Sequence, residues 1–459
     1  MKAFANQQNK QVESNRKEYG VNYDSIQWLN YYEAMEFEDK RNEIISQLGD
    51  RVNWGFNNTK TDVSRLSPGC KLCGEGQWSC LFINGKCNCN CFYCPAPQTE
   101  IGSPVTQTLT FKSPEPYIDY IKNFKFKGVS FSGGEPFLTY DKVVAFLKSI
   151  RQQLPPDIYV WMYTNGTRTS VDQLKELADL GLNELRVDIG ATNYNIKTAK
   201  DAIGIIPTVT VEIPAVPDEI EKVKSSITEL ADAGLSFINL HQLRLTPYNF
   251  NNLTARNYKF SHGARVTSPE SEMAALEILK YTLDNHIDLP VNYCSYAFKS
   301  RFQTSGLRKK LASKVIKATE EITHNGYLRA MSIDYSKHTS DLESLISSHP
   351  NEKYNIDTNS DRFYFHSDLM IEIQSFAECI YLTYTDIRFN NTISDIDIEN
   401  RNFKVETGVV ARNIKLSASE FSIFQLMRTN LRPDEVDRSD RLLSIFNYES
   451  IENGLLTIY

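Results

Sequence analysis

From about residue 80 onward, the sequence repeats one pattern: a short apolar run, a break at glycine or proline, and a segment with helical periodicity. The apolar runs are rich in β-branched and aromatic residues, as expected of strands buried on both faces. They are Leu81–Asn84, Gly128–Ser132, Ile158–Thr164, Glu184–Ile189, Thr208–Val216 and Phe237–Leu245. Strands that alternate with helices form parallel sheets through right-handed crossovers. Six such units predict an α/β fold with a partial or full barrel of the (β/α)6 type.

Two of the intervening helices have ends that the sequence marks clearly. One spans Ser170 to Leu180, where Ser170 and Gln173 stand at capping-box spacing and Gly181 follows as a stop. Another, from Glu219 to Ala233, carries its apolar residues on one stripe and ends at Gly234. Both patterns support the alternation of strands and helices.

Segments outside the barrel divide the chain into three expected parts. Ser25–Leu48 has the periodicity of an amphipathic helix that packs on the main domain. Past Tyr354, alternating strands such as DRFYFHS and ECIYLTYT indicate β structure. We therefore expect an N-terminal helical and cysteine-rich extension at residues 1–79, the barrel at 80–305, and a smaller C-terminal α+β domain at 306–459.

A long polar segment follows the sixth strand, at residues 248–269, and shows no internal periodicity. Loops of this length are usually functional or disordered, and this one is a candidate lid over the barrel mouth. A helix at Glu270–Asn285 and an apolar run at Leu289–Cys294 come next, and a basic helical stretch begins near Ser305.

Charge and targeting signals narrow the function classes. The formal charge of −7 gives no general basic field, so a nucleic-acid substrate is not favoured. The first twenty residues lack the apolar core of a secretory signal, and no run of 18 apolar residues occurs, so we expect a soluble, cytoplasmic protein without membrane partners. Seven of the nine cysteines lie between Cys70 and Cys94. In a reducing compartment such clustering favours metal ligation over disulfides.

Cys87, Cys91 and Cys94 stand at CxxxCxxC spacing directly after the first barrel strand. Three thiolates on one tight loop can hold three irons of a 4Fe–4S cluster and leave the fourth iron open to a cofactor. Three cysteines within eight residues also suit a zinc site, which remains the alternative from spacing alone.

This stretch resembles the radical S-adenosylmethionine superfamily, in which an aromatic residue precedes the last cysteine of the loop, here Tyr93. A second family element ends the next strand and comprises Ser132, Gly133, Gly134, Glu135 and Pro136. The resemblance implies that this glycine-rich turn offers backbone groups to the methionine amino group. Glycine suits that role because only glycine lets a backbone approach a ligand so closely.

The ends of the third and fourth strands carry the next implied contacts. Asn165 follows the third strand, and Arg186 and Asp188 lie on the fourth. Corresponding positions in the superfamily contact the ribose and the methionine carboxylate, and the fork of an arginine suits a carboxylate. Arg186 and Asp188 share one strand face, so they could instead pair with each other. Ile213–Val216 stands where the family packs the adenine.

More narrowly, the chain is similar to an uncharacterised radical S-adenosylmethionine group related to pyruvate formate-lyase activating enzymes. The similarity covers roughly residues 65–310, and it rests on CKLCGEGQWSCLFINGKCNCNCFYCP, NLHQLRLTPYN and YCSYAFKSRFQ. It implies an enzyme that cleaves S-adenosylmethionine reductively to a 5′-deoxyadenosyl radical, which abstracts hydrogen from the substrate, with electrons from a flavodoxin or ferredoxin type of reductant.

The substrate and the catalytic residues of the substrate step are left open. One alternative is a protein or peptide, as for activating enzymes, and another is a small molecule or nucleotide. A third is a non-catalytic protein stabilised by its metal.

Further cysteines and one histidine are candidates for other roles. Cys70, Cys73 and Cys80 form a CxxC pair with a third thiol, which predicts an auxiliary zinc ion or iron–sulfur cluster with Cys294 as the fourth ligand. The alternative is that these are free reduced thiols. We expect Cys89 to be a bystander in the cluster loop and Cys379 to be a core residue. His241, at the end of the sixth strand, is either a substrate contact or a satisfied core histidine.

Overall fold

The computed structural model describes residues 2–389, 405–417, 419–420, 423–425 and 440–458 of the chain. Contacts divide these residues into two compact units. One comprises residues 4–300 together with 454–458, and the other comprises the described residues of 301–389 and 405–453. The expected extension at residues 1–79 packs as part of the first unit, and its status as a separate domain stays a prediction.

The first unit is built on one sheet whose main strands are parallel neighbours in the order β1-β4-β5-β6-β7-β8-β9. These strands are β1 (Trp78–Asn84), β4 (Gly128–Gly133), β5 (Tyr159–Thr164), β6 (Glu184–Val187), β7 (Thr208–Pro214), β8 (Phe237–His241) and β9 (Val291–Cys294). Two short antiparallel strands, β2 (Val105–Thr106) and β3 (Leu109–Thr110), extend the β1 edge. The sheet ends at β3 and β9, which is the architecture of a partial barrel and confirms the predicted fold class.

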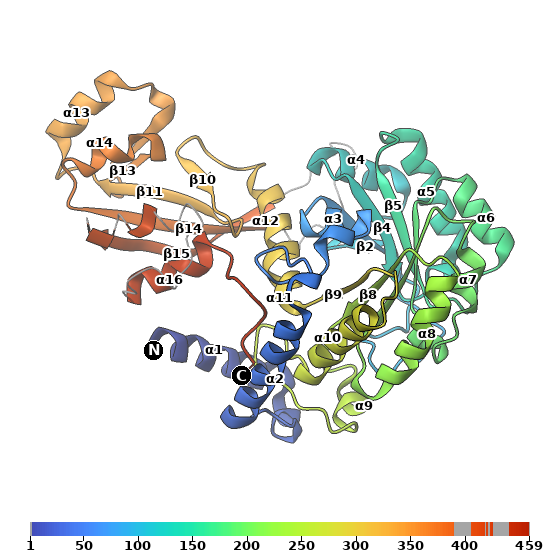
Figure 1. Cartoon of the computed structure of the whole chain (residues 1–459). Helices are drawn as coiled ribbons and strands as arrows, with labels where there is room; N and C mark the ends of the chain where they lie inside the picture. The colour runs from blue at the N-terminus through green and yellow to red at the C-terminus, as the bar shows by residue number, and fades with distance from the viewer. Residues whose placement is uncertain (1, 390–404, 418, 421–422, 426–439, 459) are drawn as a thin grey trace. The chain divides into compact units, whose positions relative to one another are not determined.

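Helices cover the outer face of this sheet (Figure 1). They are α4 (Pro114–Phe124), α5 (Tyr140–Gln153), α6 (Val171–Asp179), α7 (Lys197–Ala202), α8 (Ile220–Asp232) and α10 (Pro269–Asp284). The capping box predicted at Ser170 and Gln173 is present at the start of α6. Val129 and Phe131 of β4 are fully buried, as strands covered on both faces require.

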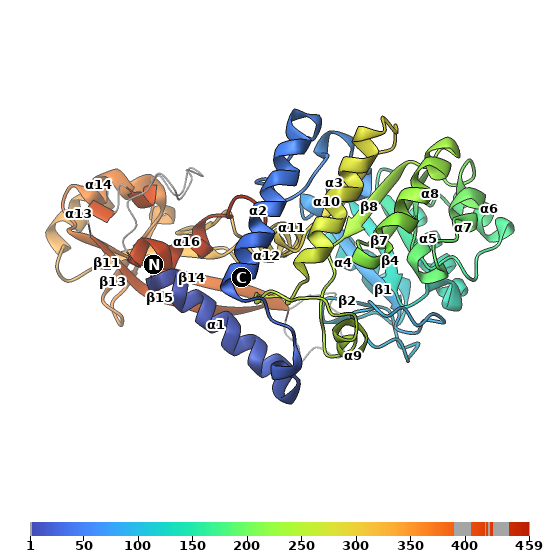
Figure 2. The same cartoon turned by 60° about the horizontal axis from the view of Figure 1, so that its bottom comes forward.

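The N-terminal segment differs from the prediction in its boundaries. The expected helix from Ser25 begins only at Tyr31, because Asn30 and Glu33 form a capping box there, and it runs to Leu48 as α2. Helix α1 (Lys2–Tyr19), a 3-10 turn (Gly20–Ser25) and the short helix α3 (Pro68–Gly74) are additional elements. Figure 2 shows α2 alongside α10, where Arg41 forms a buried ion pair with Glu272 at 3.0 Å.

The polar segment at residues 248–269 is not the structureless loop that its composition indicates. It contains α9 (Phe250–Thr254), and its apolar side chains enter a buried cluster with Tyr19, Tyr23 and Ile26. The sequence pattern fails here because the partners of these side chains lie more than 200 residues away in the chain.

The second unit is an antiparallel sheet with helices. Its strands are ordered β12-β13-β11-β14-β15, and β10 pairs with β11. They are β10 (Glu320–Ile322), β11 (Leu328–Asp334), β12 (Tyr354–Asp357), β13 (Arg362–Phe365), β14 (Cys379–Phe389) and β15 (Val405–Ser417). The helices are α12 (Thr304–Ala312), α13 (Thr339–Ser348), α14 (Met370–Gln374) and α16 (Asp440–Glu449). Ile333, Phe363 and Leu382 are fully buried in its core.

None of the helices in the described ranges is long and apolar enough to cross a membrane.

Candidate active site

A cavity of about 320 Å³ opens at the carboxyl ends of the parallel strands in the first unit. Parallel strands bring their carboxyl ends to one edge, which is where barrel folds place their sites. The predicted residues on its wall are Cys87, Cys91, Tyr93, Cys94, Ser132, Gly133, Gly134, Asn165, Arg186 and Asp188. The structure therefore brings together nearly all the side chains that the sequence nominates for the cluster and the cofactor, with Glu135 as the exception.

The three thiols at CxxxCxxC spacing lie on the loop after β1 and all line the cavity. The side-chain amide of Asn165 donates to Cys87 Sγ at 3.4 Å, and the backbone N–H of Cys94 closes a turn onto the Cys91 carbonyl at 3.0 Å. Burial raises the pKa of Cys91 to about 12. The thiol is therefore protonated near neutral pH, and a metal centre that binds Cys91 would have to displace the thiol proton, as at any thiolate site. Cys89 lies on the same loop but is not among the residues that line the cavity.

Gly133 and Gly134 allow two backbone segments to touch. A Cβ on Gly133, whose φ is +119°, would lie 2.0 Å from the Asn84 carbonyl oxygen. A Cβ on Gly134 would lie 2.0 Å from the Lys86 carbonyl oxygen, and the Glu135 N–H donates to that oxygen at 2.7 Å. The two glycines therefore allow a close approach of the turn to the backbone around the cysteine loop, and their predicted approach to a ligand stays a prediction.

Glu135 lies beneath the turn and does not face the cavity. Its side chain is fully buried, and its carboxylate accepts hydrogen bonds from the Phe137 N–H at 3.0 Å, the Thr164 hydroxyl at 2.9 Å and the Asn165 N–H at 2.6 Å. These bonds tie the glycine-rich turn to the end of β5. The Glu135 side chain thus positions the turn, and the expected contact of the turn's backbone with the cofactor stays a prediction.

Asp188 and Tyr93 form a pair on the cavity wall. The Tyr93 hydroxyl donates to both carboxylate oxygens of Asp188, at 3.0 and 3.1 Å, and the Ala191 N–H also donates to Asp188 at 3.3 Å. Burial raises the pKa of Asp188 to about 6 in spite of these bonds. The pair joins the cysteine loop to the end of β6.

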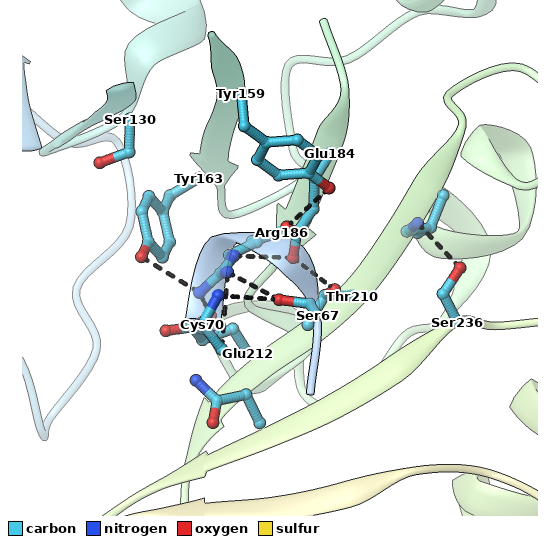
Figure 3. Close-up of polar contacts among 12 residues, drawn as sticks. Ser67, Cys70, Ser130, Tyr159, Tyr163, Glu184, Arg186, Thr210, Glu212 and Ser236 are labelled. Carbon is cyan, nitrogen blue, oxygen red and sulfur yellow. Dashed lines mark hydrogen bonds and ion pairs between the residues drawn. The ribbon is translucent and has the colours of Figure 1, made fainter. Parts of the chain in front are cut away.

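Arg186 is held inside the barrel by two carboxylates (Figure 3). Its guanidinium pairs with Glu184 at 2.9 Å and Glu212 at 2.7 Å, and it donates to the Ser67 hydroxyl at 3.1 Å. From the sequence, the candidate partners of Arg186 were a ligand carboxylate and Asp188. In the structure, the guanidinium pairs with Glu184 of β6 and Glu212 of β7. Within the described contacts, Asp188 pairs with Tyr93 instead.

The sequence reasoning missed a buried chain of polar groups beside Arg186. Lys299 Nζ donates to Nδ1 of His241 at 2.7 Å, and Nε2 of His241 bonds to Glu212. Burial and the positive charge of Lys299 lower the pKa of His241 to about 4, so the imidazole is neutral near pH 7. Nδ1 then accepts from Lys299, and Nε2–H donates to Glu212. A signal existed for Glu212, since it is a charged residue inside the apolar run TVTVEIP.

The remaining cysteines do not gather as the sequence proposed. Cys70 and Cys73 lie on α3, Cys294 ends β9, and Cys294 and Cys70 both contribute, after burial, to the raised pKa of Cys73. Cys80 bonds instead to Ser130 and Ser132. Across the described residues no group of three or more cysteine, histidine or carboxylate side chains is already arranged around a metal position. The same is true of Cys87, Cys91 and Cys94. Metal binding by these three cysteines, or by the remaining ones, would therefore require the thiols to rotate toward one another.

The chain is similar to known proteins. The radical SAM superfamily matches residues 81–241. A proposed glycyl-radical enzyme activating enzyme from Methanocaldococcus jannaschii is 29% identical over 279 residues, covering 58% of this chain and 73% of that protein.

Two further matches are shorter or more remote. A proposed activating enzyme of the same kind from Haemophilus influenzae is 31% identical over 96 residues, covering 20% of this chain and 34% of that protein. The crystal structure of Streptococcus suis SuiB bound to its precursor peptide SuiA is 12% identical, with a TM-score of 0.36, over 65% of this chain and 72% of that one. The resemblance inferred from the sequence is thereby confirmed: the chain contains a radical SAM domain at residues 81–241 and is homologous to proposed glycyl-radical enzyme activating enzymes.

Proposed function

We propose that this chain is a radical S-adenosylmethionine enzyme whose 4Fe–4S cluster is held by Cys87, Cys91 and Cys94. The observation that carries the proposal is that all three thiols of the CxxxCxxC loop line one cavity with the glycine-rich turn and the ends of β5 and β6. Three thiolates that face a cavity fit a cluster with one open iron. The match to the radical SAM superfamily supports the same cofactors.

When bound, the cluster and S-adenosylmethionine supply a 5′-deoxyadenosyl radical, formed by one-electron reduction, that abstracts a hydrogen atom from the substrate. The residues of this chain bind and orient. Gly133 and Gly134 hold the turn against the cysteine loop, and Asn165 donates toward Cys87. Ser132 and Asp188 offer hydroxyl and carboxylate groups from the wall of the cavity, which suit the polar groups of a nucleoside or an amino acid.

The partner for the methionine carboxylate has to be reconsidered, because Arg186 already has Glu184 and Glu212. The other basic side chains on the cavity are Arg244 and Lys299. Arg244 is the better candidate, since its nearest carboxylate partner, Glu18, is 4.0 Å away and its Nε is buried without a hydrogen bond among the described residues. We therefore assign the carboxylate to Arg244, and we assign to Arg186 a role in fixing β6 to β7.

We also propose a protein or peptide as the substrate, and homology to proposed glycyl-radical enzyme activating enzymes is the support for that choice. The electron would come from an external donor of the flavodoxin or ferredoxin type. Such a donor and a reduced set of thiols are consistent with a cytoplasmic location, which stays part of the proposal.

Formation of 5′-deoxyadenosine tests the proposed reaction. Anaerobically reconstituted protein, mixed with S-adenosylmethionine and dithionite, should release it, as measured by liquid chromatography and mass spectrometry. Cys87→Ala, Cys91→Ala and Cys94→Ala should each abolish the product together with the cluster absorbance. Cys89→Ala is the matched control on the same loop and should retain both. Product formation by Cys87→Ala, or its loss in Cys89→Ala alone, would contradict the ligand assignment.

A further inference from the structure

Lys299 lies on the wall of the cavity that the three thiols of the CxxxCxxC loop also line. Its ammonium group donates to Nδ1 of His241 at 2.7 Å and lies 4.8 Å from the centroid of the Tyr296 ring. A charged lysine donates hydrogen bonds and accepts none, so Nδ1 of His241 carries no proton and the imidazole is neutral. This hydrogen bond therefore joins the cation to an uncharged group.

A chain of contacts behind His241 holds this cation in position. Nε2 of His241 bonds to Glu212 of β7, and Glu212 pairs with Arg186 of β6 at 2.7 Å (Figure 3). The carboxylate of Glu212 thus has both of its oxygens engaged, one by each neighbour. Lys299 is therefore linked through the imidazole to the polar interior of the barrel, while its side chain stays on the cavity wall.

The segment that carries Lys299 is also anchored. Helix α11 (Tyr296–Phe298) directly precedes Lys299, and the Tyr296 N–H donates to the side-chain oxygen of Gln242, another residue of the cavity wall, at 3.2 Å. Lys299 then begins a π-helical turn, Lys299–Gln303. Such turns are rare and frequently lie at functional sites. A side chain that is held in this way loses little further freedom when a ligand binds.

The charged groups of the cavity wall suit a second carboxylate besides that of S-adenosylmethionine. Among the described residues that line the cavity, the carboxylates are Asp188 and Glu212, and both accept hydrogen bonds from neighbouring side chains. The basic residues besides Arg186 are Arg244, which we assign to the methionine carboxylate, and Lys299. A carboxylate is the partner that best offsets the cost of holding an ammonium group out of water.

We propose that Lys299 binds a carboxylate of the substrate, so that this cavity selects acidic peptides. The carboxylate belongs either to an aspartate or glutamate side chain or to the C-terminus of the peptide. Lys299 is then a specificity-determining residue, and His241 and Glu212 are positioning residues that hold its ammonium group. The inference rests on the proposed function, because it requires that the substrate enters this cavity beside the cofactor.

Three synthetic peptides that differ in one group test the proposal on the parent protein. Acetyl-Gly-Glu-Gly-amide has a side-chain carboxylate, acetyl-Gly-Gln-Gly has a C-terminal carboxylate, and acetyl-Gly-Gln-Gly-amide has neither. Affinities are measured by anaerobic isothermal titration calorimetry of the reconstituted protein, with saturating S-adenosylmethionine to occupy the site of the methionine carboxylate. At least one acidic peptide should bind about tenfold more tightly than the neutral one, the effect of one charge-assisted hydrogen bond, and it identifies the source of the carboxylate. Equal affinities, or no binding of any peptide, would overturn the proposal.

Variants at Lys299 test whether this residue is the one that recognises the carboxylate. Lys299→Met should abolish the preference for an acidic peptide, and Lys299→Arg, which keeps the charge, should retain it. Lys175→Met, which changes an exposed lysine on α6, is the matched control and should bind the peptides as the parent does. Circular dichroism checks that each variant is folded, and the comparison on the parent protein holds without the variants. A preference that survives in folded Lys299→Met would assign the carboxylate to another group and overturn the proposal.

Formation of 5′-deoxyadenosine by the parent protein without peptide separates this inference from the proposed function. Its absence would contradict the proposed reaction, whereas the calorimetry does not depend on turnover. Equal peptide affinities in a protein that forms 5′-deoxyadenosine would overturn only the role of Lys299.

Discussion

At the scale of single residues, two positions on the cavity wall, Asp188 and Gly134, have surroundings that disfavour a charge or a side chain. Asp188 is a carboxylate placed where burial disfavours its charge, and Gly134 stands where no side chain fits. Residues of this kind reduce stability and are retained where a site needs them. For each position we therefore predict how a substitution changes the stability of the fold and how it changes cofactor binding.

Replacing Gly134 with alanine should damage the cysteine loop. The new Cβ would lie 2.0 Å from the Lys86 carbonyl oxygen, so one of the two backbone segments must move. We expect a loss of about 1 to 3 kcal/mol in the free energy of unfolding, typical of overpacking, together with lower iron content after reconstitution. Gly408→Ala is the matched control, because a Cβ there meets nothing within 4 Å. Iron binding equal to the parent's in Gly134→Ala would show that the loop accommodates the methyl group.

Replacing Asp188 with asparagine should stabilise the apo protein near neutral pH. The pKa of Asp188 is raised to about 6 from the usual 3.8, so the folded state binds a proton more readily than the unfolded state. Asp188 therefore costs stability above about pH 6, and that cost disappears as the pH falls through 6 toward 3.8. We expect the variant to gain roughly 1 to 2 kcal/mol at pH 7.5 and little at pH 4.5 in urea unfolding.

The same variant should bind S-adenosylmethionine more weakly, because a carboxylate on the cavity wall is lost. Asp157→Asn, at an exposed position, is the control and should change neither quantity. An equal gain in stability at both pH values would mean that the charge of Asp188 is not what lowers the stability of the folded state.

At the scale of elements, the sequence predicts the barrel well, because strand and helix patterns are local. The strand predicted at Thr208–Val216 appears as Thr208–Pro214, and the capping box at Ser170 is present. The family resemblance placed the cluster and cofactor contacts at the ends of β1, β4, β5 and β6, and residues at these ends line one cavity. Contacts such as those of Lys299 with His241 join distant segments, and no local pattern encodes them.

The segment at residues 248–269 acts as a support for the cysteine loop. Asn249 donates from its side-chain amide to the Tyr93 carbonyl at 3.0 Å and the Arg244 carbonyl at 2.9 Å. Its side-chain oxygen accepts from the Thr246 N–H at 2.8 Å. The Arg256 guanidinium lies 3.6 Å from the centroid of the Phe92 ring. This segment therefore fixes the loop from outside the barrel.

Asn249→Ala should loosen this support. It leaves two partly buried carbonyl groups and one buried N–H short of a partner, which costs about 1 to 3 kcal/mol in the free energy of unfolding. The cluster should also be lost faster on exposure to a chelator, as followed by its visible absorbance. Asn252→Ala is the control, because Asn252 is an exposed asparagine in α9, the short helix that begins directly after Asn249. If both variants lost the cluster at the parent's rate, the segment would not be a support.

At the scale of the whole molecule, each of the two compact units has a buried core and a charged group that its fold depends on. In the first unit, Arg186 links Glu184 of β6 to Glu212 of β7. In the second, Arg329 of β11 pairs with Glu449 of α16 at 2.5 Å and with Glu321 of β10. The Tyr384 hydroxyl of β14 donates to the same Glu449 carboxylate at 2.6 Å. Glu449 thus ties α16 to the sheet of its own unit.

Glu449→Gln should destabilise the second unit and leave the first unchanged. The substitution keeps the shape of the side chain but removes the charge that faces Arg329, which is 3% exposed, and breaking a buried pair in this way costs about 3 to 5 kcal/mol. Glu321 remains as a partner of Arg329, so we expect a smaller loss of about 2 kcal/mol, below that range. Units with separate cores unfold as separate steps in calorimetry. The variant should lower one transition, and Gly134→Ala should lower the other. A single transition that both substitutions shift equally would mean that the two units unfold as one cooperative body.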